Sequence, residues 1–219
     1  MKRHIVVAGN IGAGKSSLVG LLSQRLGFSP YFEPAAENPY IQDFYRDMRA
    51  WALHSQLFFL GYRMRAHLAL KDDPRSAVQD RSLYEDAEVF ARNLYERGAM
   101  SERDWLTYSS LYRTMAGLLP PPDLVIYIRA SVGTLESRIA KRGRGFEDSM
   151  PAEYLQGLNA LYESWIEGFS LAPVLVVPGD ELDFVAESGD LEAIAATVED
   201  RLLDRQGSLF PLGIPSAKG

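Results

Sequence analysis

Short, mainly apolar runs alternate along the chain with longer segments in which apolar residues recur every three or four positions. The short runs lie at residues 5–7, 31–32, 77–79, 124–128 and 174–177, and they predict buried strands. The longer segments predict helices at residues 15–26, 50–71, 84–96, 101–118, 131–142, 151–169 and 191–205. A further helix is expected to start at Asn38-Pro39, because Asn caps helices well and Pro fits the first turn. This alternation predicts an α/β fold whose parallel sheet is covered by helices on both faces.

Length and composition narrow the class of protein. The 219 residues carry a net charge of -6 and contain no cysteine. We expect one domain over residues 1–219, with a loose tail at residues 206–219 that contains Gly, Pro and Ser. The acidic balance argues against a nucleic-acid-binding surface and favours a small-molecule substrate. Because no apolar stretch approaches a membrane span and no disulfide can form, a cytoplasmic enzyme without membrane contact is expected.

The first predicted strand leads into the pattern G-x-x-x-x-G-K-[ST], filled by Gly9, Gly14, Lys15 and Ser16. Glycines let such a loop wrap closely, so that backbone N–H groups converge on a polyphosphate at a helix N-terminus. Lys15 is expected to reach the β- and γ-phosphates, and the Ser16 hydroxyl to ligate Mg²⁺. Since a predicted strand and helix flank the loop, we predict a nucleoside-triphosphate site rather than a chance glycine turn. The predicted nucleotide-binding loop comprises Gly9, Asn10, Ile11, Gly12, Ala13, Gly14, Lys15, Ser16 and Ser17.

Polar side chains follow the second and third predicted strands. Glu33 comes after the second strand, and Asp80 and Arg81 come after the third. Because parallel strands end in one crevice, these residues are expected to meet the nucleotide-binding loop. A carboxylate there suits a hydroxyl acceptor, whose proton it can take, but would repel a phosphate monoester. Asp80 is a candidate ligand of Mg²⁺, and Arg81 is a candidate to contact the transferred phosphoryl group. The alternatives are that Glu33 is a helix-capping or surface acid and that Asp80 and Arg81 form a structural salt bridge.

An arginine-rich segment covers the end of the helix predicted at residues 131–142 and the loop that follows it. Arg138 and Arg142 lie four apart on one helix face, and Arg144 follows between two glycines. Such a segment can act as a lid that closes over phosphates. A solvated basic helix end, which would complement the helix dipole, is the alternative.

Two further pairs are candidates for reading a nucleobase. Gln56 and Arg63 lie two turns apart along one helix face, and Asp86 and Phe90 lie four apart on another. Amide, guanidinium and carboxylate groups could hydrogen-bond a base edge while Phe90 stacks on the base. Taken alone the pattern is weak, because aromatic residues at helical spacing more often belong to the core.

These residues together resemble the deoxyribonucleoside kinases, most closely the bacterial deoxyadenosine/deoxyguanosine kinases. The resemblance spans about residues 3–185 and is specific because the motifs occur in a fixed order. The motifs are the loop at residues 9–18, Glu33-Pro34, Asn38-Pro39-Tyr40, Gln56 with Arg63, residues 80–86, Pro122-Asp123-Leu124, Arg142-Gly143-Arg144, residues 151–155 and Glu163-Ser164-Trp165.

The resemblance implies a five-stranded parallel sheet with an arginine lid, ATP as phosphate donor, Mg²⁺ as cofactor, a homodimer and a role in nucleotide salvage. Glu33 resembles the base that acts on the 5′-hydroxyl, Arg81 the arginine that contacts this acid and the phosphates, and Asp80 the acidic Mg²⁺ partner. The other matched positions are Tyr45 and Glu147 at the deoxyribose 3′-hydroxyl, Gln56, Arg63 and Asp86 at the base, Phe90 and Trp51 in the pocket walls, and Asp183 and Phe184 under the donor adenine.

The base preference and two other enzyme classes stay open. Ser55 and Phe59 depart from the family pattern, and this leaves the shape of the base pocket undetermined. The pair of Arg63 and Asp86 favours a purine deoxynucleoside over thymidine, with deoxycytidine as an alternative. A thymidylate-type monophosphate kinase is expected to carry an Arg where Phe32 stands, and a GTPase switch an Asn-Lys-x-Asp motif that the chain lacks.

Overall fold

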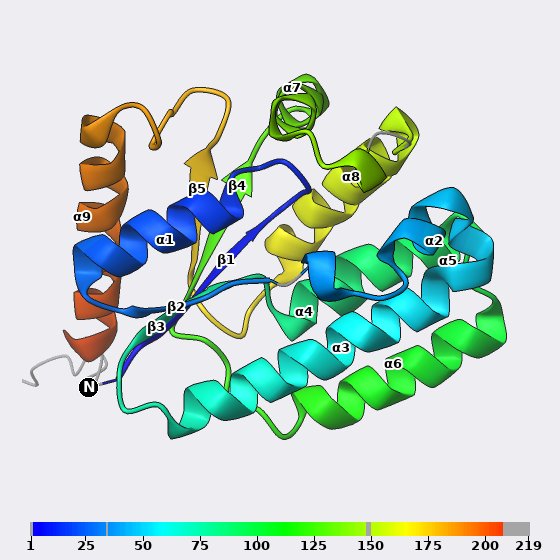
Figure 1. Cartoon of the computed structure of the whole chain (residues 1–219). Coiled ribbons are helices and arrows are strands. Elements are labelled where there is room, and N and C mark those ends of the chain that lie inside the picture. Colours follow the sequence, from blue (N-terminus) through cyan, green and yellow to red (C-terminus); the bar gives the residue numbers. More distant parts are fainter. Residues whose placement is uncertain (1, 34, 148–149, 208–219) are drawn as a thin grey trace, which may run out of the picture.

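The computed structural model describes residues 2–33, 35–147 and 150–207. Five parallel strands form one sheet in the order β2-β3-β1-β4-β5 (Figure 1), as the sequence predicts. The strands are β1 (His4–Gly9), β2 (Ser29–Tyr31), β3 (Ala77–Asp80), β4 (Leu124–Arg129) and β5 (Val174–Pro178). Val7 pairs with Asp80 and Gly9 with Ile128, so the chain leaves β1 and β3 at the same edge of the sheet.

Helices cover the sheet on both sides, so the central strand β1 is buried from Ile5 to Gly9. Figure 1 shows α1 and α9 together on one side and α3, α6 and α8 on the other. The α-helices are α1 (Lys15–Leu26), α2 (Ile41–Arg46), α3 (Met48–Asp72), α4 (Leu83–Glu85), α5 (Arg92–Glu96), α6 (Glu102–Ala116), α7 (Val132–Arg142), α8 (Ala152–Gly168) and α9 (Ser188–Gly207). The predicted loose tail begins inside α9, whose last residue is Gly207, and residues 208–219 lie outside the described part of the chain.

Glycine and short polar side chains mark several helix ends. Gly27 ends α1 with a φ of 69°, a left-handed conformation that glycine adopts without a steric penalty. The Ser101 side chain accepts a hydrogen bond from the backbone N–H of Asp104 and caps α6. Asp47 caps α3 in the same way, which moves the start of this helix two residues before the predicted Ala50.

The helix expected at Asn38-Pro39 begins later, at Ile41. Asn38 does not cap it: the Asn38 Oδ1 accepts from the Tyr40 N–H, and the Asn38 Nδ2 donates to the Ser55 hydroxyl. The buried side chain therefore forms a local turn and ties that turn to α3. The bond to the Ser55 hydroxyl requires the fold to place Ser55 beside Asn38, which the local sequence does not reveal.

The single helix predicted at residues 84–96 is divided into three. Between α4 and α5 lies a π-helical turn, η2 (Asp86–Ala91), and the short 3₁₀ turns η1 (Ala35–Glu37) and η3 (Gly145–Glu147) lie elsewhere. A π turn contains one more residue than an α turn, and such turns occur frequently at functional sites. Asp86 and Phe90 lie on this turn, and both side chains line the same cavity.

Helix α8 is held against the sheet by aromatic packing and one buried hydrogen bond. The Tyr162 ring stacks on Tyr127 of β4 with ring centroids 5.5 Å apart. The Tyr162 hydroxyl donates to the backbone carbonyl of Gly9 at 2.8 Å. One side chain thus connects α8, the sheet and the start of the nucleotide-binding loop.

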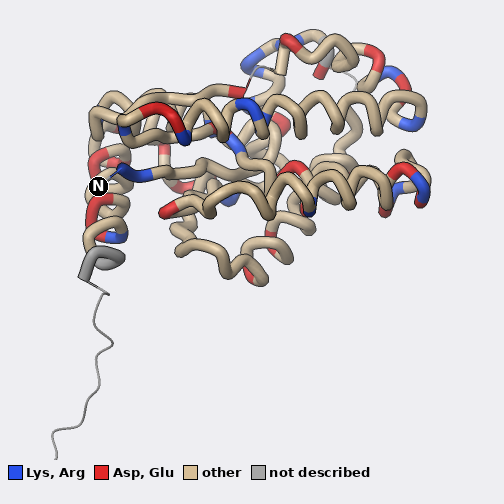
Figure 2. Tube along the Cα trace, turned by 90° about the horizontal axis from the view of Figure 1, so that it is seen from below, with Lys and Arg blue, Asp and Glu red and all other residues tan. Residues whose placement is uncertain are grey.

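The surface carries charges of both signs. Figure 2 shows Lys and Arg interspersed with Asp and Glu around the trace. No helix among the described residues is both long and apolar enough to cross a membrane.

Two glycine substitutions test the packing at the end of β5. A Cβ at Gly179 would lie 2.9 Å from the Ile128 Cγ2 and 3.0 Å from the Arg129 carbonyl oxygen, whereas a Cβ at Gly133 in α7 meets nothing within 4 Å. We expect Gly179→Ala to lower the free energy of unfolding by about 1–3 kcal/mol because the backbone has to shift. Gly133→Ala is the control and should raise it by about 0.4–1 kcal/mol. Urea unfolding measures both, and equal stabilities would contradict the tight packing at Gly179.

Candidate active site

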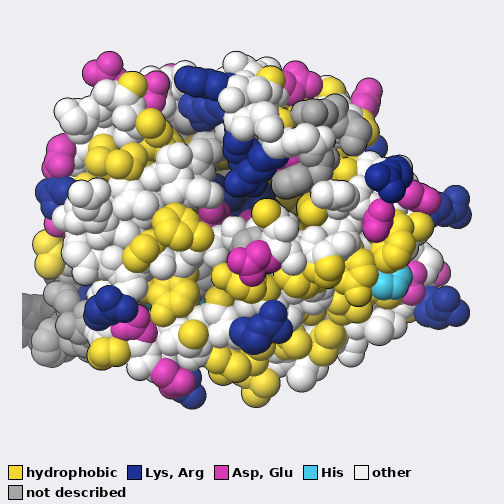
Figure 3. Space-filling view, in the orientation of Figure 1, with side chains coloured by type: hydrophobic (Ala, Val, Ile, Leu, Met, Phe, Trp, Pro, Cys, Tyr) yellow, Lys and Arg dark blue, Asp and Glu magenta, His cyan; other side chains and the backbone are white. Residues whose placement is uncertain are grey.

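Two adjoining hollows lie at the carboxyl edge of the sheet. An inner cavity is bordered by Glu33, Gln56 and Asp86, and an outer hollow of about 580 Å³ is bordered by Arg138 and Phe184. In the orientation of Figure 3, Lys and Arg side chains gather in a hollow of this face. The residues common to both linings are Gly12, Lys15, Ser16, Arg142 and Arg144.

The nucleotide-binding loop closely contacts its neighbours. Gly12 has a φ of 85°, and a Cβ there would lie 2.8 Å from the carbonyl oxygen of Leu135 in α7. The Asn10 Nδ2 donates to the Leu155 carbonyl and to the Asn159 Oδ1, both on α8. The close contact at Gly12 and the hydrogen bonds of Asn10 thus hold the loop between α7 and α8.

Lys15 is buried at the head of α1, and its ammonium group donates to the Asn10 carbonyl at 2.8 Å. Burial, with the nearby Arg81 charge, lowers the pKa of Lys15 to about 8. An anion arriving at this position would restore the favourable environment that water gives to an ammonium group. The loop is therefore suited to a polyphosphate, as the motif predicts.

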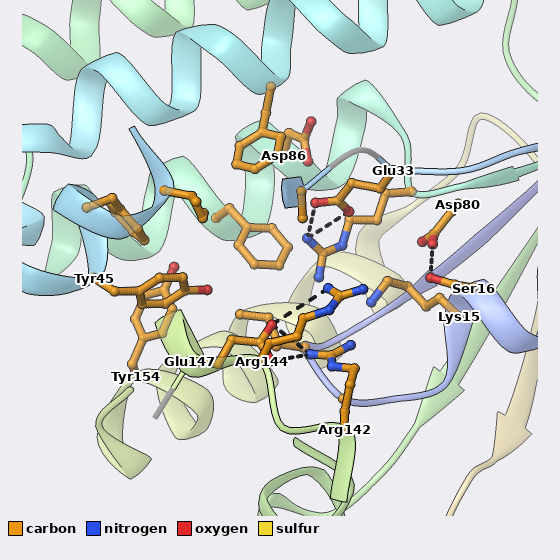
Figure 4. Close-up of a pocket in the computed structure, with 18 of the residues that line it drawn as sticks. Lys15, Ser16, Glu33, Tyr45, Asp80, Asp86, Arg142, Arg144, Glu147 and Tyr154 are labelled. Carbon is orange, nitrogen blue, oxygen red and sulfur yellow. Dashed lines mark hydrogen bonds and ion pairs between the residues drawn. The ribbon is translucent and has the colours of Figure 1, made fainter. Parts of the chain in front are cut away.

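Oxygen atoms at the start of α1 and the end of β3 suit Mg²⁺. The Ser16 hydroxyl donates to the Asp80 Oδ2 at 2.6 Å (Figure 4). The buried Asp80 Oδ1 has no hydrogen-bond partner among the described residues. Hydroxyl and carboxylate oxygens fit this ion, which usually takes few protein ligands and completes its shell with water and substrate phosphate. No cluster of three or more His, Cys, Asp or Glu is found in the described ranges, so any metal held here would rely on these few oxygens.

Glu33 lies between two arginines. Its Oε2 is 3.2 Å from the Arg81 Nη1 and 3.0 Å from the Arg63 Nη2. Burial alone would raise the pKa of Glu33, but Arg81, Arg63 and Lys15 lower it to about 2. The carboxylate is therefore ionised and faces the cavity beside the nucleotide-binding loop.

Arg81 follows β3 in a strained conformation. Its φ of 65° is positive, which is uncommon for a residue with a Cβ. The guanidinium carbon lies 4.2 Å from the centroid of the Phe90 ring, within the range of a cation–π contact. On the side away from Glu33, the Arg81 Nε is 3.4 Å from the Glu85 Oε1. Arg81 is thus fixed from three directions.

Of the predicted base-reading residues, Gln56, Asp86 and Phe90 border the inner cavity, whereas the buried Arg63 is not among the residues that border it. The Arg63 Nε donates to the Asp86 Oδ2 at 3.0 Å, and the Arg63 Nη1 donates to the Asp80 backbone carbonyl at 2.9 Å. Together with the ion pair to Glu33, these bonds make Arg63 a link between the base side and the phosphate side. The Gln56 Oε1 is buried and has no hydrogen-bond partner in the described part of the chain, so it is available to a ligand.

The side chains expected at the sugar form the opposite end of the inner cavity. Figure 4 shows Tyr45 and Tyr154 side by side, close to Glu147. Burial raises the pKa of Tyr45, and Tyr154 and Glu147 add to the effect, so its hydroxyl remains protonated and can donate. Trp51 is not among the residues that border this cavity; its ring stacks on Tyr40 with centroids 5.6 Å apart.

The arginine segment divides into two parts. Arg142 pairs with Glu147 at 2.6 Å, and Arg144 lies 3.9 Å from the same carboxylate. Arg138 instead donates to the carbonyls of Ala13 and Gly179, at 3.1 and 2.7 Å. The predicted donor residues Asp183 and Phe184 line the outer hollow together with Ser17.

Sequence reasoning missed several residues of the inner cavity and its surroundings. Glu85 is fully buried behind Arg81, although between Tyr84 and Asp86 it resembles an ordinary helix surface residue. Ile41 and Phe44, three apart on α2, and Tyr154 on α8 line the cavity. The helical spacing of Ile41 and Phe44 could have indicated one face, whereas nothing local distinguishes Glu85.

Comparison with known proteins shows one family. The family model described as deoxynucleoside kinase matches residues 5–204. The chain is 35% identical over 215 residues to the deoxyadenosine/deoxycytidine kinase of Bacillus subtilis, covering 94% of this chain and 99% of that protein. It is 38% identical over 208 residues to a deoxyguanosine kinase of Lactobacillus acidophilus, covering 90% of each chain.

The structure agrees with these matches. The deoxyadenosine kinase of M. mycoides, solved with bound dATP, superposes with a TM-score of 0.79 at 31% identity and covers 90% of this chain and 99% of that one. The matches favour a nucleoside kinase over the monophosphate-kinase and GTPase-switch alternatives. By sequence and by structure, the chain belongs to the deoxynucleoside kinase family.

Proposed function

We propose that the chain transfers the γ-phosphoryl group of ATP to the 5′-hydroxyl of a purine deoxynucleoside, as a step of nucleotide salvage. As a family member it is an ATP-dependent phosphotransferase, and its relatives include kinases named for deoxyadenosine and for deoxyguanosine. The observation that carries the proposal is the ionised Glu33 carboxylate, paired with Arg81 and Arg63 beside the nucleotide-binding loop. A hydroxyl acceptor fits there because the carboxylate can accept its hydrogen bond.

In this proposal Glu33 orients the 5′-hydroxyl and takes its proton as the oxygen attacks the γ-phosphorus. The bond from that phosphorus to the bridging oxygen breaks, and ADP leaves. Phosphoryl transfer passes through a loose transition state with little bond formation to the acceptor. A carboxylate with a pKa of about 2 is a weak base, and it suffices if most of the proton transfer follows the main barrier.

Lys15 and Arg81 neutralise the charge that spreads over the transferring group. The Lys15 ammonium group lies within the nucleotide-binding loop, where it donates to the Asn10 carbonyl, and Arg81 is fixed between Phe90 and two carboxylates. Arg142 and Arg144 border both hollows and can add charge from the lid (residues 142–147). Ser16 and Asp80 would hold Mg²⁺, which supplies charge neutralisation on the phosphates when bound.

The rest of the inner cavity is proposed to recognise the nucleoside. Gln56 and Asp86 present an amide and a carboxylate to the base edge, Arg63 supports Asp86 through their ion pair, and the Phe90 ring offers a stacking surface. Tyr45 and Glu147 are proposed to hold the 3′-hydroxyl. The name of the Bacillus subtilis relative makes deoxycytidine the second acceptor to test.

We also propose a single-domain homodimer in the cytoplasm. Leu57 and Leu68 of α3 and Leu106 and Leu111 of α6 are large apolar residues with substantial exposure, and burial against a second copy would remove them from water. The absence of cysteine suits a reducing compartment.

The first prediction concerns Glu33 as the general base. Glu33→Gln keeps the size of the side chain but cannot accept the proton, so kcat should fall by about 100- to 10,000-fold. The KM for the deoxynucleoside should change little, because an amide can still hydrogen-bond the hydroxyl. Steady-state assays with ATP, Mg²⁺ and each deoxynucleoside measure this, with the exposed Glu37→Gln as control. Full activity of Glu33→Gln would remove Glu33 from the mechanism.

The second prediction concerns base preference. Asp86→Asn leaves Arg63 paired with Glu33 but weakens the charge pair at the base, so kcat/KM for purine deoxynucleosides should fall by about 10- to 100-fold relative to thymidine. Arg63→Met with Asp86→Ala should show the same shift and also lower kcat for every nucleoside, because Glu33 loses a partner. A panel of four deoxynucleosides measures both effects. An unchanged preference would show that other residues select the base.

The third prediction concerns Mg²⁺. Asp80→Asn removes the charge of the proposed ligand, so the Mg²⁺ concentration for half-maximal rate should rise by about 10- to 100-fold. Titration of the initial rate with Mg²⁺ measures this, and Asp43→Asn on the exposed face of α2 is the control. A curve for Asp80→Asn that overlays the wild type would exclude Asp80 from the metal shell.

A further inference from the structure

Glu85 is a buried acid to which the proposed mechanism gives no role. It ends α4, directly behind the arginine that follows β3, and none of its surface is exposed. Neither carboxyl oxygen has a hydrogen-bond partner within the described residues. Its Oε1 lies 3.4 Å from the Arg81 Nε, which is longer than a normal hydrogen bond. Glu33, on the other side of the same guanidinium, is held by two arginines at 3.0 and 3.2 Å.

These contacts favour a neutral Glu85. An ionised carboxylate that is buried without hydrogen bonds loses its hydration and gains little in return. The charged groups around Arg81 that the structure describes include three cations, Lys15, Arg63 and Arg81, and three other carboxylates, Glu33, Asp80 and Asp86. The charges of these six groups sum to zero, so an ionised Glu85 would add a negative charge beside the proposed polyphosphate site.

The direction in which the pKa of Glu85 is shifted agrees with these contacts. Burial raises the pKa of Glu85 to about 8, although the Arg81 and Lys15 charges act in the opposite direction. The groups that face Glu85 from the surrounding elements are Lys15 of α1, Arg63 of α3, Arg81 after β3, Asp86 of η2 and Tyr162 of α8.

We propose that Glu85 is a positioning residue for Arg81: as a neutral acid it fills the space behind the guanidinium and leaves the arginine's charge available to the transferring phosphoryl group. An ionised Glu85 would attract the guanidinium through Nε and compete with the phosphoryl oxygens on the opposite side. The Phe90 ring packs against the face of the Arg81 guanidinium, Glu33 contacts its Nη1, and Glu85 lies beside its Nε. The inference rests on the proposed role of Arg81 in phosphoryl transfer.

The first test compares two substitutions at pH 7. Glu85→Ala opens space behind Arg81 and should lower kcat by about tenfold or more, with little change in the KM for the nucleoside. Glu85→Gln mimics the neutral acid and should restore most of that loss. Glu88→Gln is the matched control, since Glu88 lies on the outer side of η2 and hydrogen-bonds Tyr112. A Glu85→Gln variant as impaired as Glu85→Ala would show that a charged carboxylate is needed and would overturn the proposal.

The second test uses pH. In the wild type, rising pH ionises Glu85, so kcat/KM for ATP should fall above about pH 8. Lys15 also loses its proton in this range, and the Glu85 charge raises the Lys15 pKa, an effect that Glu85→Gln removes and that opposes the expected change. The informative quantity is therefore the ratio of Glu85→Gln to wild type. That ratio should rise by about three- to tenfold between pH 7 and pH 9. Parallel profiles would contradict the proposal.

A third measurement does not depend on activity. The infrared difference spectrum of wild type minus Glu85→Gln at pH 7 should contain the C=O stretch of a protonated carboxylic acid, and its absence would overturn the proposal. Arg81→Gln separates this inference from the proposed function. If Arg81→Gln keeps full turnover, the role of Arg81 itself is wrong; if it is inactive and the Glu85 variants show parallel pH profiles, only the role of Glu85 fails.

Discussion

Two buried arginines, Arg63 and Arg81, share the carboxylate of Glu33, and the geometry of the site depends on this shared ion pair. Arg63 also reaches Asp86 and the backbone carbonyl of Asp80, so one side chain ties α3 to η2 and to the end of β3. Buried charges are tolerated only when paired, and removing one partner from such a pair costs about 3–5 kcal/mol. The sheet brings the strand ends to one edge, and this ion-pair network fixes the positions of α3 and η2 relative to that edge.

The same network gives two neighbouring acids opposite properties. Glu33 and Glu85 both contact Arg81, but Glu33 also has Arg63 at 3.0 Å. The added cation outweighs burial at Glu33 and lowers its pKa, whereas burial prevails at Glu85 and raises its pKa. One acid is therefore ionised and faces the cavity, and the other is neutral and faces the protein interior. This is how a single arginine can serve a reaction without being neutralised from both sides.

The features that sequence reasoning predicted are those set by local pattern and by the geometry of parallel sheets. The loop after β1 depends on a fixed spacing of Gly9, Gly14 and Lys15, and Glu33 and Asp80 follow from the rule that parallel strands end in one crevice. Both kinds of information are present in a short stretch of chain. The positions of β1, β3 and β4 could be read in the same way, because strands buried on both faces form short apolar runs, whereas the edge strand β2 (Ser29–Tyr31) begins two residues before the predicted residues 31–32.

The features that were missed depend on contacts between distant segments. Arg138 and Arg142 share a helix face, yet Arg138 binds the carbonyls of Ala13 and Gly179 while Arg142 meets Glu147. Spacing alone cannot separate these roles. The π turn is another case, since nothing in the local pattern of residues 84–96 distinguishes it from a regular helix. The burial of Glu85 likewise appears only when α4 is packed beneath the surrounding helices.

The contact between Glu147 and Arg142 has a consequence for how the two substrates bind. A carboxylate that holds a guanidinium at 2.6 Å is a poor partner for a sugar hydroxyl, and the same guanidinium is a poor partner for a phosphate. A triphosphate that draws Arg142 away frees Glu147, and a nucleoside that engages Glu147 frees Arg142. If the triphosphate binds Arg142 and the deoxynucleoside binds Glu147, as proposed above, thermodynamic linkage requires each effect to equal the other. This one salt bridge, which would have to open for both substrates, would then make each substrate strengthen the binding of the other.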